Sequence, residues 1–139
     1  MRIALILLVT ISTLSADIVV ETQEWQPACD GSIIEVAKDH GSIKGIRASA
    51  SHNAVIVEWT VHFFGGKPIS AEYRESKREK YAHGERAGEF TGKITLKTIK
   101  TWISEKGRFQ IGDKSLAGEL HEILALAEKK TEQGAAANP

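Results

Sequence analysis

Residues 53–75 read NAVIVEWTVHFFGGKPISAEYRE, and this stretch decides the fold. Apolar side chains alternate with polar or charged ones on both sides of a Gly-Gly pair. A period of two is typical of strands that bury one face. The stretch therefore predicts two antiparallel strands joined by a turn. The apolar face of the first strand consists of Val55, Val57, Trp59, Val61 and Phe63.

The register of this hairpin follows from keeping its apolar residues on one face. A two-residue turn at the glycines would set Trp59 opposite a glutamate and mix the faces. A loop over residues 64–68 instead sets Trp59 opposite Tyr73 and Glu58 opposite Arg74. Opposite charges in such a cross-strand pair contribute roughly 0.2–1 kcal/mol. A shorter loop over residues 64–66 also keeps the faces sorted, but it sets Glu58 opposite Glu72, so we expect the longer loop.

The helix that covers this hairpin is predicted over residues 115–130. Asp113 or Ser115 is placed to cap its start. A helix with one apolar side and a sheet with one apolar side bury each other. The polar and small residues of 131–139 predict a disordered tail. The apolar side of the helix consists of Leu116, Leu120, Ile123, Leu124 and Ala127.

The remaining segments complete an α+β fold with an antiparallel sheet of about four strands, in which hairpin 53–75 is central and helix 115–130 covers one face. Residues 30–40 have apolar spacing that fits a helix better than a strand, although both remain open. Further expectations are an edge strand or extended arm at 17–24, strands at 42–50 and 90–96, and a short helix at 99–105. A bulge is expected at Gly45.

Composition limits the function. The chain has 139 residues, 42% of them hydrophobic and 26% charged, which suits a single domain over residues 17–130. The formal net charge is +0. Because no bulk charge draws the chain to nucleic acid or to an anionic membrane, we expect neither as a partner.

Residues 1–16 have the layout of a secretory signal peptide, with Arg2 before an apolar run and small residues at Ser15 and Ala16. A buried first strand or helix is the alternative. The run is shorter than the roughly 20 apolar residues of a membrane span, so we expect no transmembrane segment in the mature chain. The pattern predicts a periplasmic or secreted protein.

Cys29 is the single cysteine of the chain, so no disulfide forms within it. Three uses remain open: a small buried apolar residue, a disulfide to a second chain, and a catalytic thiol. The most charged run, residues 74–89, is either a solvated hairpin end or mobile loop, or a partner-binding loop.

The sequence contains no phosphate-binding loop, no Cys-x-x-Cys and no His-Glu-x-x-His motif. We therefore expect no cofactor and no metal site. Strand geometry brings titratable groups together in one place, the polar face of the hairpin, where Glu58, His62 and Arg74 share a side. Phe64, beside the turn, is a candidate exposed anchor. Ser70 is expected opposite His62, but flat paired strands offer no converging oxyanion donors.

Two functions are consistent with these residues. The first is an exported, non-catalytic binding or inhibitory module whose partner is a protein or small ligand in the envelope or extracellular space. Its binding residues would be Glu58, His62, Phe64 and Arg74. A related possibility is a subunit of a larger envelope assembly, anchored by Phe64. The alternative is a small exported hydrolase that uses histidine and carboxylate residues from separate segments. The hydrolase requires a pocket that brings two of His52, Glu58, His62 and His83 within hydrogen-bond reach.

Overall fold

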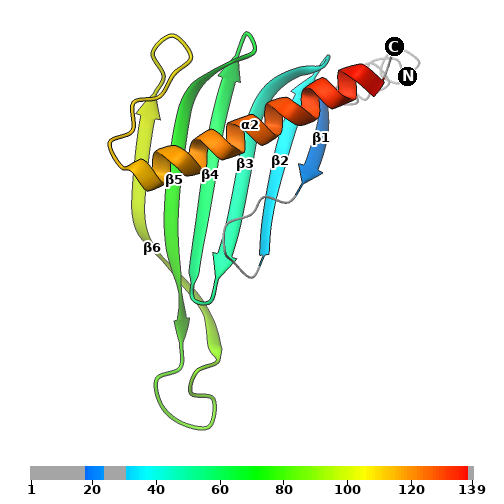
Figure 1. Ribbon diagram of the computed structural model, residues 1–139. Helices are drawn as coiled ribbons and strands as arrows, with labels where there is room; N and C mark the ends of the chain where they lie inside the picture. Colours follow the sequence, from blue (N-terminus) through cyan, green and yellow to red (C-terminus); the bar gives the residue numbers. More distant parts are fainter. Residues whose placement is uncertain (1–17, 24–30, 138–139) are drawn as a thin grey trace, which may run out of the picture.

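The computed structural model of the chain describes residues 18–23 and 31–137. Within these residues, six strands form one antiparallel sheet, and a helix crosses one of its faces (Figure 1). The elements are β1 (Ile18–Gln23), β2 (Gly31–Asp39), β3 (Ser42–His52), β4 (Val55–Phe64), β5 (Lys67–Lys80), β6 (Phe90–Ile103) and α2 (Lys114–Ala137). Each strand pairs with its neighbour in the sequence. The α+β class is confirmed, whereas the predicted number of about four strands is too low. The predicted signal peptide and Cys29 lie outside the described residues.

Away from the turn, the predicted register of the central hairpin is confirmed. Trp59 of β4 lies opposite Tyr73 of β5, and Glu58 lies opposite Arg74. Sorting apolar from polar residues therefore gives the correct alignment, because a slip by one residue would move every side chain to the other face.

The predicted loop over residues 64–68 is wrong. β4 and β5 are joined by a two-residue turn, in which Gly65 and Gly66 have φ angles of 60° and 78°. Positive φ at both central residues is what the common type of two-residue hairpin turn requires. A register shift beside the turn leaves Ile69 without a partner on β4. This bulge allows the short turn and the sorted faces to coexist.

The preference for a helix over residues 30–40 is wrong, since this segment is strand β2. Ile34 and Val36 are buried on the side of α2, while Ile33 lies on the opposite side and is exposed. The adjacent isoleucines imitate helical spacing because both faces of the strand carry apolar residues. His40 and Gly41, with φ angles of 53° and 80°, form the turn into β3 instead of ending a helix.

The short helix predicted over residues 99–105 is also wrong, because β6 continues to Ile103. Its register against β5 shifts between Glu75 and Ser76, which leaves Lys97 as an extra residue. This bulge places Leu96 and Ile99 on the same face although they are three residues apart. Three-residue spacing on one face is the pattern of a helix, and here a bulged strand produces it.

The predicted helix is confirmed as α2, and it is longer than expected. Asp113 Oδ1 accepts hydrogen bonds from the backbone N–H groups of Ser115 (2.9 Å) and Leu116 (3.2 Å), so Asp113 is the cap. The helix continues to Ala137. Residues 131–137 thus belong to α2, and the last three of them are alanines, the residue with the highest helix propensity.

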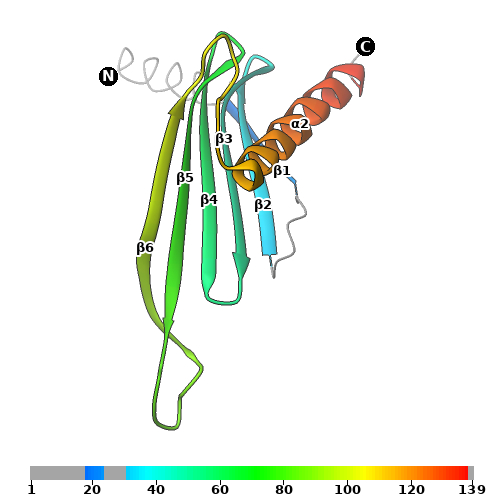
Figure 2. The ribbon, with the colours of Figure 1, turned by 60° about the vertical axis from the view of Figure 1, so that its left-hand side comes forward.

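The core lies between α2 and one face of the sheet. Figure 2 shows the helix on a single side, with the far ends of β5 and β6 extending past the other strands. Trp59 is only 1% exposed and Val61 is fully buried. α2 contributes Leu116, Leu120, Ile123 and Ala127 to this core. We call the other side of the sheet, which no described element covers, the open face. One row across it runs Ile33, Ser49, Glu58, Arg74, Ile99.

Candidate functional site

The structure places the predicted site residues on the open face but does not gather them into a pocket. Glu58 and Arg74 are neighbours in one row. His62 lies four residues further along β4, opposite Ser70 as predicted, which separates it from Glu58 by roughly 13 Å of extended strand. Phe64 lies at the turn and is 78% exposed. The four residues are therefore spread along β4 and β5 and do not form one cluster.

The polar contacts of this surface differ from the simplest expectation. Arg74 Nε donates to Glu72 Oε1, the carboxylate two residues away on the same face of β5. Arg74 and Glu58 lie directly opposite each other, yet no ion pair between them is among the contacts of the described residues. The register therefore predicts which residue lies opposite Arg74, but not which residue forms an ion pair with it.

The geometry that a hydrolase requires does not form on these residues. Among the described residues, no hydrogen bond joins any two of His52, Glu58, His62 and His83. A hollow of about 270 Å³ beside Glu58 is lined also by Ile33, Ser49, Ile56 and Arg78, with no histidine among its lining residues. The described part of the chain also contains no group of three or more histidine, cysteine or acidic side chains placed to hold a metal ion.

An apolar stripe on β6 is the feature that sequence reasoning missed. Ile99 lies opposite Arg74 and Ile103 opposite Ser70, so both face the open side. The bulge at Lys97 brings Leu96 and Ile94 onto the same side. All four are exposed, and Ile103 reaches 77%. We call Ile94, Leu96, Ile99 and Ile103 the β6 stripe. The sequence of β6 did not reveal the stripe, because the bulge at Lys97 interrupts the alternation of the strand.

The other side of β6 carries positive charge. Lys100 lies opposite Tyr73, on the side of α2, and Lys97 lines a hollow of about 530 Å³ together with Lys77 and Thr95. The other residues that line this hollow are Ala54, Arg78, Glu79 and Lys80. Four cationic residues and one acidic residue thus surround a cavity in a chain whose formal net charge is +0.

The start of β6 is held against β5 by an aromatic ring between cations. The guanidinium carbon of Arg78 lies 5.3 Å from the centre of the Phe90 ring, and Lys80 Nζ lies 5.1 Å from it. Lys80 Nζ also donates a 2.7 Å hydrogen bond to Asn53 Oδ1 in the turn between β3 and β4. These contacts attach the far end of the β5–β6 hairpin to the sheet.

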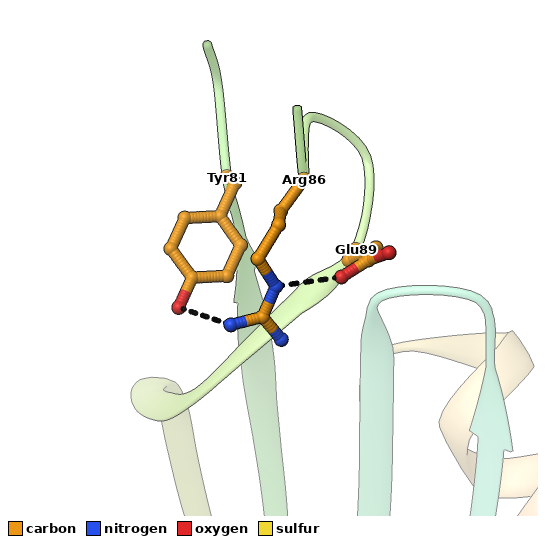
Figure 3. A network of polar contacts seen from close by, with 3 residues as sticks. All are labelled: Tyr81, Arg86 and Glu89. Carbon is orange, nitrogen blue, oxygen red and sulfur yellow. Dashed lines mark hydrogen bonds and ion pairs between the residues drawn. The ribbon is translucent and has the colours of Figure 1, made fainter. Parts of the chain in front are cut away.

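The loop that joins β5 to β6 is closed by its own contacts. Arg86 Nε donates to Glu89 Oε2 at 2.8 Å, and the Arg86 guanidinium reaches the Tyr81 hydroxyl at 3.4 Å (Figure 3). The Tyr81 backbone N–H donates to the Glu89 carbonyl at 3.0 Å. Residues 74–89 are thus the end of a long hairpin, one of the two predictions for this run.

A partly buried polar contact joins α2 to the sheet. Trp59 Nε1 donates to Glu119 Oε1 at 2.9 Å. Burial raises the pKa of Glu119, the hydrogen bond from Trp59 lowers it, and the charge of Glu122 raises it, with a net upward shift. Burial likewise raises the pKa of Tyr73, whose hydroxyl donates to Glu75. Glu119 and Tyr73 lie on the side of the sheet that α2 covers, away from the open face.

Comparison with known proteins adds no assignment: no family model, no curated protein and no solved structure matches the chain. Within the described residues, no helix combines the length and the apolar character that crossing a bilayer requires. A functional assignment therefore depends on the surface residues and their geometry.

Proposed function

We propose that the chain is an exported, non-catalytic binding module that holds a protein partner on the open face of its sheet, along β6. The observation that supports this most is the β6 stripe: four exposed apolar side chains on one side of one strand, with Thr101 between the last two of them. Contiguous exposed apolar side chains mark interaction sites in soluble proteins, whereas scattered ones need no explanation.

The surroundings of the stripe fit a protein surface better than a small molecule. Arg74 and Glu72 lie beside Ile99 and form a polar border to it. An apolar centre with a charged border is the usual arrangement of a protein interface. The location outside the cytoplasm rests on the pattern of residues 1–16, which predicts a secretory signal.

The proposal is tested with two matched substitutions on the same sheet. Ile99→Ser removes an apolar side chain that is 50% exposed on β6, and Val20→Ser removes one that is 56% exposed on β1. The tagged wild-type chain and both variants are used to capture proteins from the envelope and culture fluid of the source cells. We expect a protein that wild type and Val20→Ser retain and Ile99→Ser loses. Identical captured proteins for all three chains would contradict the proposal.

A further inference from the structure

Within the residues that the structure describes, no strand pairs with the outer edge of β6. In the described sheet, β6 pairs with β5 from Ile103 to Phe90 and has no partner on its other side. Backbone polar groups alternate in direction along a strand, so about half of those in β6 point away from β5. Proteins usually keep such edges short, but β6 has 14 residues. This long edge offers main-chain hydrogen bonds to an extended segment.

The two faces of this edge differ in chemistry. The β6 stripe lies on the open face, and the charges of β6 come from Lys93, Lys97 and Lys100, with no acidic residue in the strand. All three lysines are exposed, and within the described residues none of them is in an ion pair. The nearest acidic residues of β5 have other contacts: Glu75 accepts from Tyr73, and Glu79 accepts from Thr91.

This charge pattern distinguishes between possible occupants of the edge. A second copy that paired antiparallel with β6 through its own β6 would place the lysines of both copies on the same face of the joined sheet, and like charges close to one another destabilise a strand pair. An extended segment whose acidic side chains face these lysines is instead stabilised by opposite charges at the same positions. The hollow that Lys97 and Lys77 line extends from β6 across β5 to Ala54 and adds further positive charge to this part of the sheet.

Building on the proposed function, we propose that the partner adds an extended segment to the free edge of β6 as a further strand. Its apolar side chains lie on the open face beside the β6 stripe. Its alternate side chains are acidic and face Lys97 and Lys100. Successive side chains of a strand point to opposite faces of the sheet. One segment with alternating apolar and acidic residues can therefore contact both the β6 stripe and the lysines.

The test uses three synthetic probes: a peptide that alternates valine with glutamate, one that alternates valine with lysine, and a shuffled form of the first. Binding to the full chain is measured by fluorescence anisotropy, and backbone hydrogen exchange is followed in β6 and β1. We expect the alternating glutamate peptide to bind at least roughly tenfold more tightly than the others, the sum of a few cross-strand charge pairs. We also expect it to slow exchange in β6 and not in β1.

The double variant Lys97→Glu/Lys100→Glu is the matched charge control. We expect it to prefer the lysine peptide while keeping the unfolding midpoint of wild type. Equal binding of all peptides, no binding, or unchanged exchange in β6 would overturn strand addition by an acidic segment. Self-association of the wild-type chain that Ile99→Ser abolishes would assign the edge to a second copy instead. The proposed function fails separately, when Ile99→Ser still retains the native partner.

Discussion

Trp59 and Glu119 join the central strand to the helix: the indole Nε1 of Trp59 donates a 2.9 Å hydrogen bond to Glu119 Oε1. The Trp59 ring also lies 5.1 Å from the Tyr73 ring and 5.6 Å from the Trp102 ring, measured between centroids. The indole thus contacts both neighbouring aromatic residues and still satisfies its polar N–H. This arrangement lies on the face of the sheet that α2 covers, and the opposite face stays open.

The raised pKa of Glu119 predicts a pH-dependent effect of Glu119→Gln. The folded state holds the proton more tightly than the unfolded chain, in which the pKa is near its ordinary value of 4.5. The stability that Glu119 contributes is therefore complete below that pH and is lost as the pH rises through the higher folded-state pKa. Glutamine keeps an oxygen acceptor for Trp59 without titrating.

Urea unfolding of wild type and Glu119→Gln at a series of pH values measures this effect. We expect the free energy of unfolding of the variant, relative to wild type, to increase as the pH rises above about 4.5. Glu128→Gln, at an exposed position on the same helix, is the control. A difference that stays constant or decreases with pH would refute the upward shift.

Removing the Trp59 side chain tests the core directly. Because Trp59 is buried at 1% exposure, Trp59→Ala is expected to lower the free energy of unfolding by roughly 3–5 kcal/mol. Phe64→Ala, at a residue exposed on the same strand, is expected to change it by less than about 0.5 kcal/mol. Chemical denaturation of both variants gives the comparison. Similar losses for both would mean that the faces of β4 are assigned wrongly.

The ion pair between Arg74 and Glu72 predicts which carboxylate is energetically coupled to Arg74. A double-mutant cycle of Arg74→Ala with Glu72→Ala is expected to give a coupling free energy of about 0.2–1 kcal/mol, as for other partly exposed pairs. The cycle of Arg74→Ala with Glu58→Ala is expected to give less, although the two residues face each other. A larger coupling free energy in the second cycle would show that Arg74 pairs with Glu58 on the opposite strand and not with Glu72.

Strong periodicity made part of the fold predictable from the sequence. Long uninterrupted alternation around Trp59 fixed its pairing with Tyr73, and regular spacing from Leu116 onward fixed the covering helix. Elsewhere the prediction was wrong because of β-bulges. The extra residue Lys97 turned a strand pattern into apparent helical spacing, and the unpaired Ile69 concealed a two-residue turn.

The candidate surface was likewise predictable only in part. Register alone places Glu58 beside Arg74, but the side-chain conformation decides that Arg74 contacts Glu72, and no pattern encodes that choice. The exposure of Ile99 could not be read from its own segment. It depends on α2 covering the opposite face, a relationship between residues distant in the chain.

Site-specific photo-crosslinking in the source cells tests the central claim most directly. A photoreactive amino acid is placed at Ile99 on β6 in one variant and at Val20 on β1 in the other, both exposed positions on strands at opposite edges of the described sheet. A binding surface along β6 predicts a crosslinked protein of one defined mass from position 99 and none of that mass from position 20. The same product from both positions, or none from position 99, would contradict it.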